Sequence, residues 1–294
     1  MSVKSAIQLL RPLQWAKNVF IFLPLFFNAS FGHLHLLFSC VIAFIAFSLA
    51  ASSVYCFNDI LDLDADKLHP EKCKRPIASG KVSKKQAYIL MTATFTLSML
   101  VILVGGFEHK LSTAGLIVVY YLLNIAYSLG LKQIAILDVM LVAFFFVVRV
   151  IVGGVATGIH LSEWIVLMTF LLALFLAFAK RRDDVVIFQN TGVTMRKNIG
   201  NYNLEFINQV LTLIAGTTII AYIIYCVSPE VTERFRCKYV YLTAIFVLAG
   251  MIRYLQITIV DLKSGSPTKT LLKDRFIQIC ILGWMATFTF IIYL

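Results

Sequence analysis

Runs of about 20 uncharged, mostly apolar residues recur along the whole 294-residue chain. A helix of about 20 apolar residues crosses the roughly 30 Å hydrocarbon core of a bilayer. Hydrophobic residues make up 60% of the chain and charged residues 14%, whereas an ordinary soluble domain is about 25% charged. The pattern therefore predicts an integral membrane protein that is all-α.

We count nine such runs, which predict nine transmembrane helices in one bundle and a single domain over residues 1–294. The connecting segments contain no soluble domain, low-complexity tract or internal repeat. The predicted spans are residues 18–30, 36–57, 86–106, 112–131, 134–154, 164–179, 208–227, 239–260 and 276–294.

Lys and Arg are distributed unevenly between the two sides of this predicted bundle. The N-terminal segment and the links after the second, fourth, sixth and eighth spans contain 20 of these residues, and the alternate links contain 4. Short loops rich in Lys and Arg stay in the cytosol. We therefore expect a multi-pass protein of the plasma membrane with its N-terminus and its polar clusters on the cytosolic side and its C-terminus outside.

The formal net charge of +11 suits a cytosolic membrane face, anionic lipids or phosphorylated substrates. We expect no nucleic-acid partner, because no soluble basic domain is present to bind one. The six cysteines form no CxxC pair and have no zinc-like histidine spacing beside them. We interpret them as reduced structural residues. The sequence leaves the oligomeric state open, a homo-oligomer included.

Four aspartates directly follow the second predicted span, where that helix leaves the bilayer. At 100° per residue, Asp59, Asp62 and Asp66 share one stripe of a helix, whereas Asp64 lies on the other side. Aligned carboxylates repel one another, so a cation should accompany them. Mg²⁺ binds one or two carboxylates together with phosphate oxygens of a substrate. The stripe thus predicts a site for Mg²⁺ and a diphosphate, and a solvated helix end neutralised by nearby lysines is the alternative.

The motif NDxxDxxxD is formed by Asn58, Asp59, Asp62 and Asp66. It resembles the aspartate motif of the UbiA superfamily of intramembrane prenyltransferases. The sequence RPIASG, which begins at Arg75, is similar to the RPxxSG loop of the same superfamily. Members are nine-helix, Mg²⁺-dependent enzymes. The resemblance implies that the three aspartates bind the metal and are catalytic, with Asn58 and Arg75 at the substrate.

Further segments resemble one branch of the superfamily, the decaprenyl-phosphate phosphoribosyltransferases. In a basic run, Lys180, Arg181 and Arg182 occupy the place where ordinary prenyltransferases carry a second aspartate-rich motif. Three cations suit a donor with a diphosphate and a separate phosphate, although a cytosolic membrane anchor would also explain them. Asp184 stands where the branch usually has Glu. The similar segments are Arg11 to Asn18, Tyr127-Ser128 with Leu131-Lys132, Arg149 with Gly153-Gly154, Ser162 with Trp164, Lys180 to Asp184, Gly265 to Arg275, and Trp284.

The resemblance implies transfer of 5-phosphoribose from 5-phosphoribosyl 1-diphosphate to a decaprenyl-like polyprenyl phosphate, with Mg²⁺ as cofactor. We expect Lys180, Arg181 and Lys132 to hold phosphates, and Asp184 to assist a metal or bind ribose hydroxyls. Tyr127 and Lys17 are further candidates for substrate binding. A Tyr of the interfacial aromatic belt or a snorkelling Lys accounts for these two equally well.

Two ionisable residues lie inside the fifth predicted span. Asp138 indicates a function or an ion pair, because a charge in the membrane is costly. Arg149 lies eleven residues further, which is about 16 Å at 1.5 Å per residue, so it cannot easily serve the same site. We expect the acidic end after the second span and the basic end of the sixth to face one substrate pocket.

Two other functions remain open at this point. A conventional UbiA-type prenyltransferase, which moves a prenyl group from a diphosphate to an aromatic or other small acceptor, would share the fold and the aspartate motif. A secondary transporter would also have many spans, but it usually shows internal repeats and helices broken near mid-membrane. A CDP-alcohol phosphotransferase is excluded, because the DG and AR dipeptides of its motif are missing between Asp59 and Asp66.

Overall fold

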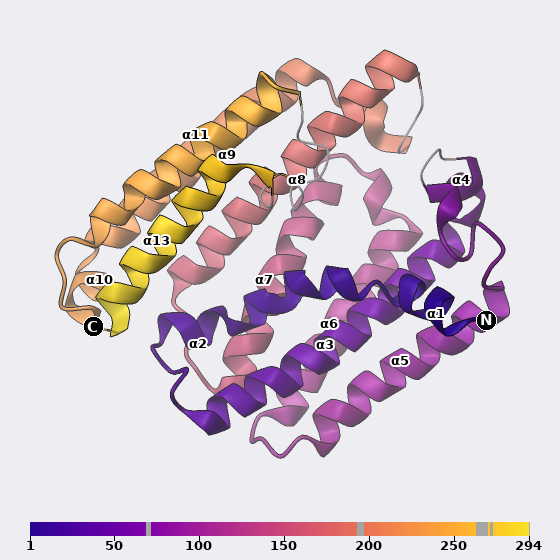
Figure 1. The fold of residues 1–294 in the computed structure, drawn as a ribbon, viewed down its shortest axis with the longest axis horizontal. Helices are drawn as coiled ribbons and strands as arrows, with labels where there is room; N and C mark the ends of the chain where they lie inside the picture. Colours follow the sequence, from indigo (N-terminus) through magenta and orange to yellow (C-terminus); the bar gives the residue numbers. More distant parts are fainter. Residues whose placement is uncertain (69–71, 193–196, 263–269, 271–272, 294) are drawn as a thin grey trace. The chain divides into compact units, whose positions relative to one another are not determined.

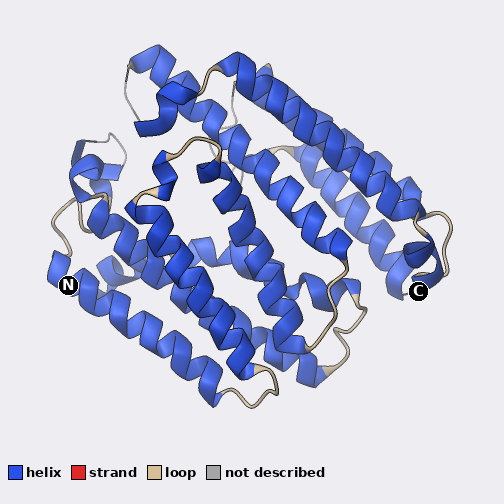
Figure 2. Cartoon of the chain, turned by 180° about the vertical axis from the view of Figure 1, so that it is seen from behind, coloured by secondary structure: helices blue, strands red, loops and turns tan. Residues whose placement is uncertain are grey.

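The computed structural model describes residues 1–68, 72–192, 197–262, 270 and 273–293. Within these ranges all regular structure is helical and no residue lies in a strand (Figure 2). The all-α prediction is therefore confirmed. Most of the segment Gly265 to Arg275, which carries part of the family resemblance, lies outside the described residues.

Among the described residues, seven helices are long and apolar enough to cross a membrane. They correspond to predicted spans two to eight (Figure 1). The counterpart of the ninth span, α13 (Arg275–Tyr293), contains a shorter apolar stretch, Arg275–Ile291. The seven are Leu34–Leu61 (α3), Lys84–Val104 (α5), Lys110–Leu129 (α6), Leu137–Thr157 (α7), Glu163–Asn190 of α8 (Glu163–Thr191), Leu204–Val227 (α9), and Val240–Ile259, which joins the 3-10 helix η5 (Val240–Thr243) to α11 (Ala244–Ile259).

The first predicted span, residues 18–30, is not one continuous α-helix. A 3-10 helix, η1 (Pro12–Phe22), is followed by the short helix α2 (Leu23–Phe27). Pro24 lies in the first turn of α2. Proline has no N–H, and its ring clashes with the carbonyl group four residues earlier in an α-helix. An α-helix that began before Pro24 could therefore not run through it unbroken.

Polar side chains cap three of the long helices at positions that the sequence makes recognisable. The hydroxyl group of Ser83 accepts a hydrogen bond from the Gln86 N–H, and the Gln86 side chain accepts one from the Ser83 N–H. Ser162 and Asn203 likewise accept hydrogen bonds from N–H groups in the first turns of α8 and α9. These caps satisfy N–H groups that the helices leave unpaired, and they fix where α5, α8 and α9 begin.

The chain forms two compact units, Met1–Leu131 with Phe145–Leu161, and Lys132–Phe144 with Ser162–Leu294. In the first unit, α3 packs against α5, α6 and η1. A buried apolar cluster joins the N-terminal helix α1 (Val3–Leu10) to the end of α3, where the aspartate motif lies. Its members are Leu9, Cys56, Ile60, Leu63, Ile77, Val82 and Ala87.

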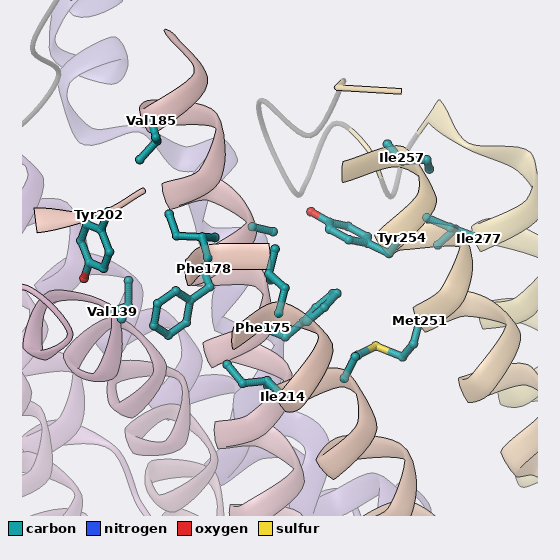
Figure 3. Packing of buried hydrophobic residues seen from close by; sticks show 14 of the residues in the cluster. Val139, Phe175, Phe178, Val185, Tyr202, Ile214, Met251, Tyr254, Ile257 and Ile277 are labelled. Atoms are coloured by element: carbon teal, nitrogen blue, oxygen red, sulfur yellow. The ribbon is translucent and has the colours of Figure 1, made fainter. Parts of the chain in front are cut away.

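In the second unit, α9 packs against α8 and α11, and α11 packs against α13. The core of this unit contains Phe175 and Phe178 of α8, together with Val139 of α7 and Tyr202 (Figure 3). Tyr254 and Met251 of α11 belong to the same cluster. This core packs the middle and the C-terminal part of α8 against its neighbours.

Arg149 of α7 is 5% exposed and lies inside the first unit. Its Nε donates a hydrogen bond to Asn18 Oδ1 at 2.8 Å. Its guanidinium carbon lies 5.1 to 5.4 Å from the ring centres of Phe47, Tyr120 and Phe146. Cation–π contacts and hydrogen bonds of this kind stabilise a buried guanidinium. Arg149 therefore connects α7 to η1, α3 and α6.

The backbones of α7 and η1 approach each other closely at Gly153. A Cβ atom added there would lie 1.9 Å from the carbonyl oxygen of Ile21. We predict that Gly153→Ala lowers the free energy of unfolding by about 1–3 kcal/mol or more, because backbone has to move. Thermal melting of the purified protein in detergent measures this. Gly115→Ala is the matched control, because a Cβ on Gly115 meets nothing within 4 Å, and an equal loss in both variants would contradict the prediction.

Candidate active site

The aspartate motif extends over the end of α3 and a second short helix. α3 ends at Leu61, and Asp62 caps it with its N–H on the Asn58 carbonyl oxygen at 2.9 Å. The next helix is α4 (Leu63–Leu68). The prediction that one continuous helix carries all three aspartates of the stripe is therefore wrong, because the helix is interrupted at Asp62. The Asp66 N–H still donates to the Asp62 carbonyl oxygen at 2.7 Å, which keeps helical spacing across the junction.

The four aspartates differ in their exposure. Asp59 is 2% and Asp66 3% exposed, whereas Asp62 is half-buried and Asp64 is exposed. Burying a carboxylate is costly unless a cation or several hydrogen bonds compensate it. The two buried aspartates therefore require partners.

Two arginines supply these partners. Arg75 Nη1 lies 3.1 Å from Asp59 Oδ1 and 2.7 Å from Asp66 Oδ2. Arg11 Nη2 lies 2.5 Å from Asp59 Oδ1. The side chains of Arg11 and Arg75 are 25% and 26% exposed. We call Asp59, Asp62 and Asp66, together with these two arginines, the acidic centre.

The role of Arg11 was not predicted from the sequence, although Arg11 begins a segment that resembles the phosphoribosyltransferase branch. Arg11 ends α1 with φ +53° and ψ +56°, and its N–H donates to the Ile7 carbonyl oxygen. This left-handed conformation is uncommon for a residue other than glycine. The turn directs the chain from α1 into η1 and places the guanidinium of Arg11 on Asp59, 48 residues further along.

The acidic centre fits a metal that it shares with a substrate. Among the described residues, no group of three or more Asp, Glu, His or Cys side chains could hold a metal ion by itself. Asp59 Oδ2, however, is buried and has no hydrogen-bond partner in the described part of the chain. Mg²⁺ commonly takes few protein carboxylates and completes its shell with phosphates and water. An open carboxylate oxygen beside other acids suits that kind of binding.

Three more predicted site residues lie in the same unit. The Asn58 side-chain oxygen accepts a hydrogen bond from the Ser128 hydroxyl group of α6. The Tyr127 ring packs edge-on against Phe145, with ring centres 5.9 Å apart. Lys17 is half-buried in η1. Asn58 is thus held by α6 directly beside Asp59 of the acidic centre, whereas the contact between Tyr127 and Phe145 concerns packing.

The basic run lies inside a helix. We expected the sixth span to end at Ala179, but α8 continues to Thr191. Lys180 is exposed, whereas Arg181 and Arg182 are 4% and 3% exposed. In an α-helix consecutive residues point about 100° apart, so the two arginines meet different neighbours.

Arg181 is held between two carboxylates, which lie on either side of it. Its Nη2 pairs with Asp138 Oδ2 on α7, and its Nη1 lies 2.7 Å from Asp184 Oδ2. Asp138, which is fully buried, is therefore part of an ion pair, one of the two interpretations left open by the sequence. We call Asp138, Lys180, Arg181 and Asp184 the basic centre. Lys132, in the 3-10 helix η3 (Leu131–Gln133), belongs to the same unit.

Tyr202 completes the surroundings of Asp138 and was not identified from the sequence. Its hydroxyl group donates to Asp138 Oδ1 at 2.8 Å and accepts a hydrogen bond from the Ile136 N–H at 2.6 Å. A phenol is neutral at physiological pH and can donate, and burial raises the pKa of Tyr202 further, to about 12. Ile136 has φ +69°, an unfavourable conformation for a β-branched residue, and Tyr202 fixes this turn.

Arg182 points away from Asp138. Its Nε donates to Asn208 Oδ1 of α9 at 2.7 Å, and its Nη1 donates to the Thr258 carbonyl oxygen of α11 at 2.6 Å. These bonds tie α8 to α9 and α11. We conclude that Arg182 has a structural role.

Residues 18–279 match the model of the UbiA prenyltransferase family. A decaprenyl-phosphate phosphoribosyltransferase of Mycolicibacterium smegmatis is 32% identical, over 99% of this chain and 93% of that protein. One of Mycobacterium tuberculosis is 31% identical, over 97% of this chain and 93% of its own length. A UbiA homolog from Archaeoglobus fulgidus, solved bound to GPP and Mg²⁺, has a similar fold, with TM-score 0.67, 18% identity, and coverage of 99% of this chain and 100% of that one.

Proposed function

We propose, from the premise that this multi-pass membrane protein belongs to the UbiA prenyltransferase family, that it transfers 5-phosphoribose from 5-phosphoribosyl 1-diphosphate to a polyprenyl phosphate. The observation that carries the proposal is the 32% identity, over nearly the full length of both chains, to a protein named decaprenyl-phosphate phosphoribosyltransferase. The acidic centre supports it chemically, because its carboxylates and arginines suit a metal-bound diphosphate.

In this reaction the bond between the anomeric carbon and the diphosphate of the donor breaks, and a bond forms from that carbon to an oxygen of the acceptor phosphate. When bound, Mg²⁺ stabilises the negative charge of the leaving diphosphate. Asp59, Asp62 and Asp66 are the residues proposed to hold it. The acceptor phosphate is already an anion near neutral pH, so the protein needs no strong base and acts mainly by positioning and charge stabilisation.

The remaining predicted residues are assigned to the substrates. Phosphate oxygens are assigned to Arg75, Lys132, Lys180 and Arg181, and the ribose hydroxyls or a metal to Asp184. Asn58 supports the metal-binding aspartates, Tyr127 is assigned to a phosphate or a ribose hydroxyl, and Lys17 is assigned to a phosphate.

We propose nine membrane crossings, with the N-terminus and the active site on the cytosolic side of the plasma membrane. Besides the seven long helices, the 11 residues of η1 extend about 22 Å at roughly 2.0 Å per residue, and α2 adds about 7 Å. Arg275–Ile291 extends about 25 Å. Both lengths approach the thickness of the hydrocarbon core. The family match from residue 18 to 279 includes parts of both compact units and supports a single domain.

A transfer assay tests the function. We predict that membranes containing the protein move radiolabel from 5-phosphoribosyl 1-diphosphate into the lipid phase only when polyprenyl phosphate is present, and that EDTA abolishes this transfer until Mg²⁺ is restored. Membranes without the protein are the control. Transfer of a prenyl group from a prenyl diphosphate to a small acceptor, with no labelled lipid from the ribose donor, would favour the conventional prenyltransferase instead.

A further inference from the structure

The two buried carboxylates of the acidic centre are already neutralised by protein cations. Asp59 and Asp66 contribute two negative charges, and Arg11 and Arg75 contribute two positive charges within 3.1 Å. We propose that Arg11 and Arg75 are internal counter-ions that leave these carboxylates and bind the donor's diphosphate when magnesium arrives, so that magnesium and diphosphate bind as a pair. This inference rests on the proposed function only in that the donor carries a diphosphate.

Magnesium alone binds this arrangement poorly for a physical reason. Arg75 Nη1 touches both Asp59 and Asp66 and so occupies the position between their carboxylates. A divalent cation at the same carboxylates would repel the guanidinium and leave it without an anionic partner, and unpaired charges in a partly buried place are unfavourable. The free energy needed to displace Arg75 from the two carboxylates therefore weakens the binding of magnesium alone.

A diphosphate that binds together with magnesium removes this cost, because it gives the displaced arginine a new anionic partner. Its oxygens match the planar fork of a guanidinium, and they also bind magnesium. The arginines can move toward a ligand, because each is about one quarter exposed, whereas Asp59 is 2% exposed and fixed in the core. Asp59 Oδ2 is unpaired in the described part of the chain and offers the metal one oxygen before any arginine moves.

This arrangement assigns a ligand to Arg11, which the sequence motifs did not. Arg11 touches Asp59 from the junction of α1 and η1, while Arg75 touches it from the RPIASG loop. Two guanidiniums from separate segments would then bind the same diphosphate. Because linkage is reciprocal, diphosphate should raise the affinity for the metal by the same factor by which the metal raises the affinity for diphosphate, about 5–150-fold for couplings of ordinary size.

Binding measurements on the purified full-length protein test the coupling without any turnover. Radiolabelled inorganic diphosphate is titrated at several free Mg²⁺ concentrations, and Mn²⁺ binding is followed by electron paramagnetic resonance with and without diphosphate. Complexes of metal and diphosphate in solution are accounted for by expressing binding against free concentrations. We expect weak binding of each ligand alone and binding at least about tenfold tighter when both are present.

The variant Arg75→Gln removes one counter-ion. It should bind Mn²⁺ alone about tenfold or more tightly than the wild type, and should lose most of the mutual enhancement. Arg11→Gln affects the contact to Asp59 only. Like Arg75→Gln, it should raise the affinity for Mn²⁺ alone and reduce the mutual enhancement, and it serves as the test if Arg75→Gln does not fold. Lys85→Gln is the matched control, because it removes one positive charge from an exposed position of α5 and should change neither.

The outcomes separate the counter-ion inference from the proposed function. If the wild type binds diphosphate with magnesium but both arginine variants keep wild-type metal affinity and coupling, the counter-ion inference is wrong and the proposed function stands. If the wild type binds no diphosphate at any magnesium concentration, both are wrong.

Discussion

Replacing Asp62 with Asn is expected to lower the rate of transfer by about 10²–10³-fold, the usual effect of removing one preorganised charge-stabilising group. Asn keeps the size of the side chain, and the bond with which residue 62 caps α3 is made by its backbone N–H, so this cap should persist. The rate of label transfer at saturating substrate, measured over a range of Mg²⁺ concentrations, shows the loss. The apparent melting temperature should stay within a few degrees of that of the wild type.

Asp64→Asn is the matched control for Asp62→Asn. Asp64 is exposed and lies two residues away in the same segment, so its variant loses the same charge without touching the acidic centre and should keep nearly full activity. A comparable loss in both variants would show that overall charge at this surface matters, rather than a ligand role for Asp62. Asp59→Asn should lose stability as well as rate, because Arg11 then has no carboxylate at its Nη2.

The helices were predictable because their signal is local. An apolar run of about 20 residues has one stable arrangement in a bilayer, and the seven long helices follow such runs. The aspartate motif was also recognisable, since its spacing is read along a few residues. Its break at Asp62 was not, because a helical stripe predicts the direction of side chains but not the point at which one helix gives way to the next.

The partners of the charged residues could not be predicted, since they come from distant segments. Arg11 and Asp59 are 48 residues apart, and Arg181 and Asp138 are 43 apart. Each pair forms because a buried carboxylate has to be compensated, yet the sequence does not show which of 26 Lys and Arg residues does so. Tyr202 gave no signal at all, because one Tyr beside a membrane interface usually belongs to the aromatic belt.

The pair of Arg181 and Asp138 leads to the second large effect. Asp138 is fully buried, with Arg181 and Tyr202 on its two oxygens. Arg181→Gln should lower the free energy of unfolding by about 3–5 kcal/mol, because it leaves a buried carboxylate without a cation, and the apparent melting temperature should fall by about 10 °C. Asp138→Asn should lower the free energy of unfolding by less, since Arg181 keeps its ion pair with Asp184 at 2.7 Å. Asp184→Asn should lower it least, because the buried ion pair between Arg181 and Asp138 remains.

Donor binding separates the structural role of Arg181 from its proposed role in the site. Arg181→Gln should weaken binding of 5-phosphoribosyl 1-diphosphate by about tenfold or more, since a charge-assisted hydrogen bond to phosphate is worth roughly 1.5–3 kcal/mol. Asp138→Asn keeps the guanidinium and should bind the donor within a few-fold of the wild type. Equilibrium binding at a temperature well below the melting point of every variant makes the comparison. If donor affinity is unchanged in Arg181→Gln, or falls equally in both variants, Arg181 positions α7 and α8 and does not contact the donor.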